Sequence, residues 1–222
     1  MVKQKYSLSE IEAEYNLAAK HNCEFKKVKW ASHEKMINRF YLAMKELPFN
    51  ISSSWLDVGC GTGAFQALVG TNFPHIRSLA IDISQELINF VKTRKDMMGV
   101  EFMLIDFMSL KDRQFDLITS IGVLQKTTFS VKEFFQQTYN LLAPGGRVFV
   151  DTKHINWKMF HKPNFSPEPS HQWFNLDKLI KSAQRSGLEV DRYGGFLPEE
   201  GKVVPPEDSH TIFLIARKRG IS

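Results

Sequence analysis

The sequence predicts an α/β protein, in which a doubly wound, mostly parallel sheet carries helices on both faces. From Ser54 onward, short apolar runs alternate with helical patterns, and such alternation is typical of a parallel sheet covered by helices. The first apolar run leads into a turn with three glycines in five residues, at positions 59–63. The 222 residues suffice for one domain with a large core, but not for two of ordinary size.

Apolar periodicity and cap residues predict the elements in order. Two helices precede the glycine turn, at residues 8–20 and 32–47, and Ser32 caps the second. The strands expected for the sheet lie at residues 54–58, 78–82, 100–104, 115–120 and 146–152. The helices expected between them lie at residues 64–69, 85–95 and 131–142.

The pattern changes after residue 152. Residues 154–173 are rich in aromatic residues and histidines and contain several prolines, so we expect a loop or a small cap there. Asn175 then caps a helix whose apolar residues share one side. Two final strands are expected at residues 188–193 and 210–217, joined by a Gly/Pro loop, and the last strand is expected to be antiparallel.

Composition excludes several classes of protein. The net charge is +5, but the basic residues are scattered, which favours a solvated surface over a nucleic-acid interface. No apolar run approaches the roughly 18 residues of a membrane span, and the polar N-terminus is not a signal peptide. Cys23 and Cys60 form no disulfide framework and have no metal-binding spacing. We therefore expect a cytoplasmic protein with no bound metal.

The glycine turn predicts a ligand site in a Rossmann-like arrangement. Ligands of such sheets bind at the carboxyl ends of the strands, where glycines allow close approach and a helix offers free N–H groups. Gly59, Gly61 and Ala64 satisfy a dinucleotide fingerprint, and Asp82 follows where an acid would hold a ribose. An NAD-dependent oxidoreductase therefore stays open. Its Tyr-x-x-x-Lys pair occurs at residues 41–45, upstream of the turn, and we interpret it as helix surface.

Three features favour S-adenosylmethionine over NAD. Asp57 lies two residues before Gly59, where a carboxylate suits a ligand with an ammonium and a sulfonium but would repel a pyrophosphate. Asp106 ends the third strand and could accept a hydrogen bond from an adenine amino group. The chain also ends in a helix and two strands, the last with alternating Ile212, Leu214 and Ala216.

Five segments carry a resemblance to a known family: LDVGCGTG at 56–63, AIDIS at 80–84, IDF at 105–107, FDLITSIGVLQK at 115–126 and LLAPGGRVFV at 141–150. From about residue 55 to residue 152, the chain resembles class I S-adenosylmethionine-dependent methyltransferases of the small-molecule type. The last third is more weakly similar to ubiquinone-type O-methyltransferases. The chain departs at Gln125, where relatives often carry a histidine.

The resemblance implies a set of site residues. Asp57, Gly59 and Gly61 would hold the amino-acid end of the cofactor, Asp82 the ribose, and Asp106 with Phe107 the adenine. The full cofactor set implied is Asp57, Gly59, Cys60, Gly61, Gly63, Asp82, Ile83, Asp106, Phe107 and Ile121. The residues expected at the acceptor are Tyr15, Trp30, Gln125, His154, Trp157 and His171. His154 is the expected catalytic base, with His161, His171 and His210 as rivals.

The sequence thus predicts one domain that transfers a methyl group to a hydroxyl or an amine of a small molecule. Residues 1–50 would form a helical lid, 51–152 the cofactor-binding core, 153–175 a substrate cap, and 176–222 the C-terminal helix and strand pair. We expect a monomer or homodimer. A methyltransferase acting on nucleic acid or protein, an NAD-dependent oxidoreductase and a non-catalytic cofactor-binding protein remain alternatives.

Overall fold

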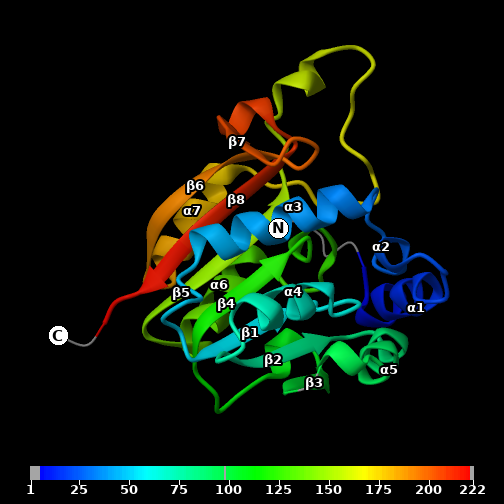
Figure 1. Cartoon of the computed structure of the whole chain (residues 1–222). Coiled ribbons are helices and arrows are strands. Elements are labelled where there is room, and N and C mark those ends of the chain that lie inside the picture. The colour runs from blue at the N-terminus through cyan, green and yellow to red at the C-terminus, as the bar shows by residue number, and fades with distance from the viewer. Residues whose placement is uncertain (1–5, 98, 221–222) are drawn as a thin grey trace.

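The computed structural model describes residues 6–97 and 99–220. In this part of the chain, eight strands form one sheet in the order β3-β2-β1-β4-β5-β8-β6-β7 (Figure 1). Within the run β3-β2-β1-β4-β5, each strand is parallel to the next. Strand β8 is antiparallel to both β5 and β6. Their bounds are Ser54–Val58, Arg77–Asp82, Val100–Leu104, Phe115–Ile121, Leu142–Lys153, Leu188–Leu197, Lys202–Val204 and Thr211–Lys218, for β1 to β8 in chain order. The predicted fold class and the antiparallel last strand are confirmed.

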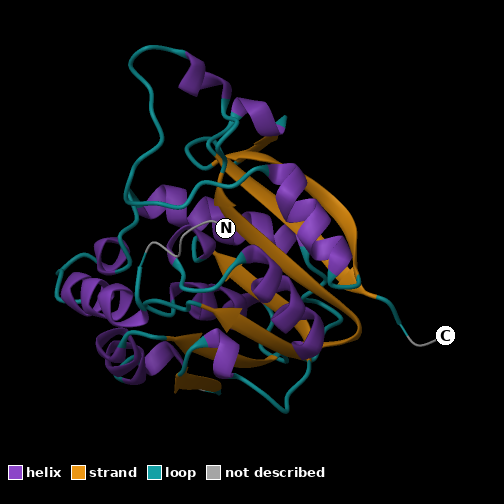
Figure 2. Cartoon of the chain, turned by 180° about the vertical axis from the view of Figure 1, so that it is seen from behind, coloured by secondary structure: helices purple, strands orange, loops and turns teal. Residues whose placement is uncertain are grey.

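Helices cover both faces of the sheet (Figure 2), so the central strands β1, β2 and β4 are buried on both sides along most of their length. In β2, Leu79 and Ile81 pack in the core beneath α6 and α7, whereas Ala80 faces α5. The opposite core contains Trp55 and Phe149, beneath α3 and α4. The bounds of these helices are His33–Glu46 for α3, Ala64–Asn72 for α4, Gln85–Lys92 for α5, Val131–Leu141 for α6 and Leu176–Arg185 for α7.

Side-chain caps explain where the helices begin. The hydroxyl of Ser32 accepts the backbone N–H of Lys35 at the start of α3. Ser130 and Glu133 form a reciprocal capping box at α6, and Asn175 caps α7 as expected. These contacts satisfy N–H groups that have no partner inside the helix. The sequence therefore locates the starts of these helices to within a residue.

Three features were not expected from the sequence. The short helix α2, Glu24–Lys27, follows α1, Leu8–Ala18, and β7 pairs with β6 inside the expected Gly/Pro loop. Strand β5 also begins at Leu142, which pairs with Phe115 across an irregular register, rather than at residue 146. Each depends on contacts with distant residues, which local pattern does not report.

The N-terminal helix α1 lies against α5, beside the carboxyl end of β2 (Figure 1). The side-chain oxygen of Asn16 accepts the hydroxyl of Ser84 at 2.7 Å and the backbone N–H of Glu86 at 3.2 Å. The hydroxyl of Tyr6 reaches the carbonyl of Ser170 at 2.9 Å. The N-terminal segment thus meets both the sheet edge and the segment that follows β5.

A buried ion pair joins α3 to the sheet. Arg39 of α3 donates two hydrogen bonds to the carboxylate of Asp151 in β5, and the two side chains are 6% and 1% exposed. Asp151 also accepts the backbone N–H of Gly122 at 2.7 Å. The Arg39 guanidinium lies 4.3 Å from the centre of the Trp30 ring. Helix α3, the end of β4 and β5 are therefore held at one point.

We expect Arg39→Met to lower the free energy of unfolding by about 3–5 kcal/mol, because it leaves the Asp151 carboxylate buried without its counterion. Urea unfolding of the ligand-free protein measures this. Arg113→Met is the matched control: Arg113 pairs with Glu101 at 2.8 Å, and the two side chains are 39% and 51% exposed, so its loss should cost about 1 kcal/mol or less. Equal losses in the two variants would contradict the assignment.

Candidate cofactor and acceptor site

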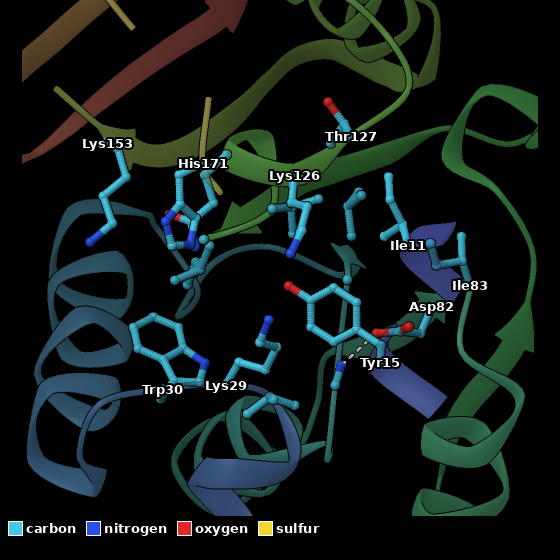
Figure 3. Close-up of a pocket in the computed structure, with 18 of the residues that line it drawn as sticks. Ile11, Tyr15, Lys29, Trp30, Asp82, Ile83, Lys126, Thr127, Lys153 and His171 are labelled. Atoms are coloured by element: carbon cyan, nitrogen blue, oxygen red, sulfur yellow. Dashed lines mark hydrogen bonds between the residues drawn. The ribbon is translucent and has the colours of Figure 1, made fainter. Parts of the chain in front are cut away.

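A cavity of about 370 Å³ lies at the carboxyl ends of β1, β2 and β4 (Figure 3). This is the size of a typical small-molecule site. One end is lined by the glycine turn and by strand-end residues, namely Gly59, Gly61, Asp82, Ile83, Asp106, Phe107 and Ile121. The other end is lined by residues of the N-terminal segment, of the end of β5, of the segment that follows it and of the residue before β8, among them Trp30, Lys35, Lys153, His171 and His210.

The glycine turn needs its glycines for two reasons. Gly59 and Gly61 have φ values of +76° and +57°, which side chains disfavour. A Cβ on Gly61 would lie 2.5 Å from a methyl group of Val28, and one on Gly59 would collide with Val123. Close packing of the protein against the turn thus restricts these positions in addition to any ligand.

Asp82 fixes the turn and faces the cavity at the end of β2. Its carboxylate accepts the backbone N–H groups of Gly61 and Ser84, each at 2.9 Å. Burial raises the pKa of Asp82 in spite of these bonds. Each carboxylate oxygen can accept more than one hydrogen bond, so Asp82 keeps capacity for the hydroxyls of a ribose.

Asp106 and Phe107 follow β3 and line the cavity together. The carboxylate of Asp106 accepts the backbone N–H of Met108 at 2.7 Å, which fixes its orientation. Phe107 is 3% exposed and packs against Phe129 and Phe134. An apolar ring beside a hydrogen-bond acceptor suits a purine base.

Asp57 lies beneath the turn, beside a small adjoining cavity that also contacts Cys60. Its carboxylate accepts the side-chain N–H of Gln66 and the hydroxyl of Thr119, both at 2.6 Å. Burial nevertheless raises the pKa of Asp57 to about 7. A buried acid of this kind gains stability from a nearby cation, which fits the ammonium and sulfonium of S-adenosylmethionine.

Comparisons with known proteins agree with this geometry. Residues 56–150 match the family described as "Methyltransferase domain". This core is a class I S-adenosylmethionine-dependent methyltransferase domain. The malonyl-acyl-carrier protein O-methyltransferase of Acetivibrio thermocellus is 26% identical over 157 residues, which are 70% of this chain and 54% of that protein. The chain thus spans about half the length of this relative.

Two solved structures share the fold of the methyltransferase domain over nearly the whole chain. The cyclase SpnF superposes with a TM-score of 0.73 at 17% identity, covering 97% of each chain. The N-methyltransferase NodS of Bradyrhizobium japonicum, in complex with S-adenosyl-L-homocysteine, gives 0.68 at 15% identity, covering 93% of this chain and 97% of that one. The activities named for these two proteins differ, so the fold alone does not decide the reaction.

Most of the predicted cofactor residues of the methyltransferase domain meet at the cavity, but three do not line it. Asp57 and Cys60 border the small adjoining cavity. Gly63 caps α4 in a left-handed conformation, next to Met97. Tyr41, the tyrosine of the dehydrogenase-like pair, is 53% exposed on α3, so its interpretation as helix surface is confirmed.

Four predicted acceptor residues line the cavity: Tyr15, Trp30, Gln125 and His171. Burial and the nearby Asp82 raise the pKa of Tyr15 to about 12, so its phenol stays protonated at neutral pH. The side-chain oxygen of Gln125 is buried, with no hydrogen-bond partner among the described residues, and could bind a donor on a ligand. Trp157 lies outside the lining and packs on His210, with ring centres 5.2 Å apart.

The expectation for His154 needs correction. The residue is 3% exposed, and it is absent from the described lining of the cavity. Its Nδ1 lies 2.9 Å from the carbonyl oxygen of Pro206. Side chains alternate along β5: Phe149 and Val150 pack on opposite faces. The side chain of His154 lies on the same face of the strand as that of Val150 and points away from the cavity. The side chain of Lys153 lies on the same face as that of Phe149 and lines the cavity.

The sequence patterns did not indicate the basic side chains of the lining, which are Lys29, Lys35, Arg39, Lys126 and Lys153. These residues come from the N-terminal segment, from the turn after β4 and from the end of β5, so they share no local motif. Strand parity was a usable signal for Lys153 alone. In the described part of the chain, no helix is both long and apolar enough to cross a membrane.

We expect the stability of Asp57→Asn, measured relative to wild type in the absence of ligand, to be greater at pH 8 than at pH 5. The folded-state pKa of about 7 lies above the ordinary value of 3.8, so the contribution of Asp57 to wild-type stability is greatest at low pH and falls as pH rises toward 7. The variant has no carboxyl group at this position and therefore lacks this loss. One pKa unit corresponds to about 1.4 kcal/mol, and the variant's advantage in unfolding free energy should grow by at least that much between pH 5 and pH 8. Urea titrations at both pH values measure it, and a constant difference would refute the assigned shift.

Proposed function

We propose that this chain transfers a methyl group from S-adenosylmethionine to a hydroxyl of a small molecule. The observation that carries the proposal is that one cavity of about 370 Å³ has strand-end acids and the glycine turn at one end and histidines at the other. The relative from Acetivibrio thermocellus is named as an O-methyltransferase, which supports an oxygen acceptor.

The residues of this chain would hold the cofactor by charge and by hydrogen bonding. Asp82 would accept the ribose hydroxyls, Asp106 the adenine amino group, and Asp57 with the turn would face the amino-acid end. When bound, S-adenosylmethionine supplies an electrophilic methyl group on a sulfonium. The protein then acts chiefly by orienting an acceptor toward that group and by excluding water.

His171 is the residue we propose as general base. It lines the cavity, and its Nδ1 lies 2.8 Å from the carboxylate of Glu168. With Nδ1 donating to Glu168, Nε2 is the nitrogen left to accept a proton from an acceptor hydroxyl. Burial lowers the pKa of His171 below its ordinary 6.5, so the ring is neutral at physiological pH.

His210 is the rival to His171 within the same lining. Burial, with Lys153 as the next cause, lowers the pKa of His210 to about 4. Its Nδ1 lies 2.9 Å from the hydroxyl of Thr211, and no carboxylate is seen within 4 Å of its ring among the described ion pairs. Both histidines are neutral, but only His171 has the orienting acid.

Calorimetry should show that the protein binds S-adenosylhomocysteine and does not bind NAD. Asp82→Ala should weaken that binding by about 1.5–3 kcal/mol, the range for a hydrogen bond to a charged group. Asp191→Ala is the matched control, since Asp191 pairs with Arg147 and Arg217 on the outer strands and should leave affinity unchanged. Binding of NAD with no response to S-adenosylhomocysteine would sink the methyl-transfer proposal.

With an acceptor found by screening small hydroxy compounds against labelled cofactor, His171→Ala should lower kcat by about 10²–10⁴, the usual value of a positioned base. The base must be unprotonated, so the rate should fall only below pH 6.5, where His171 gains its proton. His161→Ala, on the exposed turn Lys158–His161, is the control and should keep kcat. Normal kcat in His171→Ala, with a loss in His210→Ala, would transfer the role to His210.

A further inference from the structure

We propose that the acceptor carries an anionic group, a carboxylate or a phosphate, which binds Lys153 at the end of the cavity opposite Asp82 (Figure 3). The inference rests on the proposed methyl transfer and names the chemical class of its acceptor. It arises from the distribution of charge along the cavity.

Lys153 is held in place by its backbone. It is the last residue of β5 and pairs with Thr211 of β8. Its carbonyl accepts the N–H of Phe174 at 2.9 Å. Strand parity then directs the side chain into the cavity, where Figure 3 shows it beside His171. A charge on a rigid strand is better placed for recognition than one on a mobile loop.

Lys153 also has no direct ion pair. Its ammonium takes part in none of the ion pairs found among the described residues, and the contact found is with the Trp173 ring, whose centre is 5.9 Å away. The side chain is half-buried, and burial together with Arg39 lowers the pKa of Lys153 to about 8. A desolvated cation without a partner gains stability from a bound anion.

The other cations of the lining already have acids. Arg39 is paired with Asp151, and Lys35 lies 2.6 Å from Glu199. Lys29 and Lys126 share the single carboxylate of Glu14.

Glu168 is the acid of the lining at this end of the cavity, and it is already engaged. It pairs with His171 and accepts the hydroxyl of Ser170. Glu168 and Asp151 still act on the charge of Lys153 at longer range, but no acid contacts its ammonium directly, and its charge faces the cavity.

The opposite end has the opposite charge. Asp82 and Asp106 line it, as a cationic cofactor requires. The cofactor's own carboxylate would lie near the turn, where Val28 packs on Gly61. Lys29 follows Val28 in the chain and is the cation that we assign to the cofactor carboxylate. Lys153 would then be available to bind the acceptor.

The first test titrates inorganic phosphate and, separately, acetate into the protein by calorimetry, with and without S-adenosylhomocysteine and at constant ionic strength. Wild type should bind at least one of them saturably; which one binds tells a phosphate acceptor from a carboxylate acceptor. Lys153→Gln should weaken the binding at least tenfold, about 1.4 kcal/mol, and Lys153→Arg should retain most of it. Lys181→Gln, which removes an exposed charge on α7, is the control.

Three results would overturn the proposal: no saturable anion binding by wild type, equal binding by Lys153→Gln, or a loss confined to Lys126→Gln. A second test pairs each acid in the acceptor screen with its amide. The amide should show a KM raised at least tenfold with wild type and no such penalty with Lys153→Gln. Efficient use of the amide by wild type also overturns the proposal. Failure to bind S-adenosylhomocysteine would instead contradict the proposed methyl transfer, and the result on anion binding by Lys153 would still hold.

Discussion

The arrangement of the site depends on the buried pair of Arg39 and Asp151. Asp151 stands near the end of β5 and Arg39 on the lid helix α3, and the pair is nearly removed from solvent. In such surroundings, either charge alone would be costly, so the two elements are held together. Because Asp151 also binds Gly122 and Arg39 lies over Trp30, the same contact sets one wall of the cavity.

The acidic and the basic residues of the cavity that this pair helps to form lie mostly at opposite ends. The end that we propose for the cofactor carries Asp82 and Asp106, and burial raises the pKa of Asp82 and of Asp57 in the adjoining cavity. The acceptor end carries Lys153 and two histidines whose pKa values are lowered. In both halves, burial disfavours the charged form. A bound ligand of the opposite charge would therefore stabilise the charged form of the groups in each half.

Much of the fold could be predicted because its signals are local. Strands Ser54–Val58 and Val100–Leu104 were located to the residue, since an apolar run and its flanking turns are adjacent in sequence. The helix starts followed from Ser and Asn caps, which act within three residues. The early start of β5 and the presence of β7 were not predicted. They depend on the pairing of Leu142 with Phe115 and of Val204 with Gly195, and the local sequence pattern gives no information on such contacts.

The sequence by itself determined the part of the cavity lining that we propose for the cofactor. Gly59, Gly61, Asp82 and Asp106 lie at strand ends, and parallel strands bring such ends to one edge of the sheet. Only the tertiary structure decided which residues line the other end: it brings Trp30 and His171, which the sequence had suggested, together with Lys153, which it had not. These residues come from separate segments, so their meeting depends on packing. The histidine favoured by the sequence, His154, failed for a simpler reason. Side chains alternate along a strand, and the one-residue step from Lys153 to His154 moves a side chain from the cavity to the opposite face of the sheet.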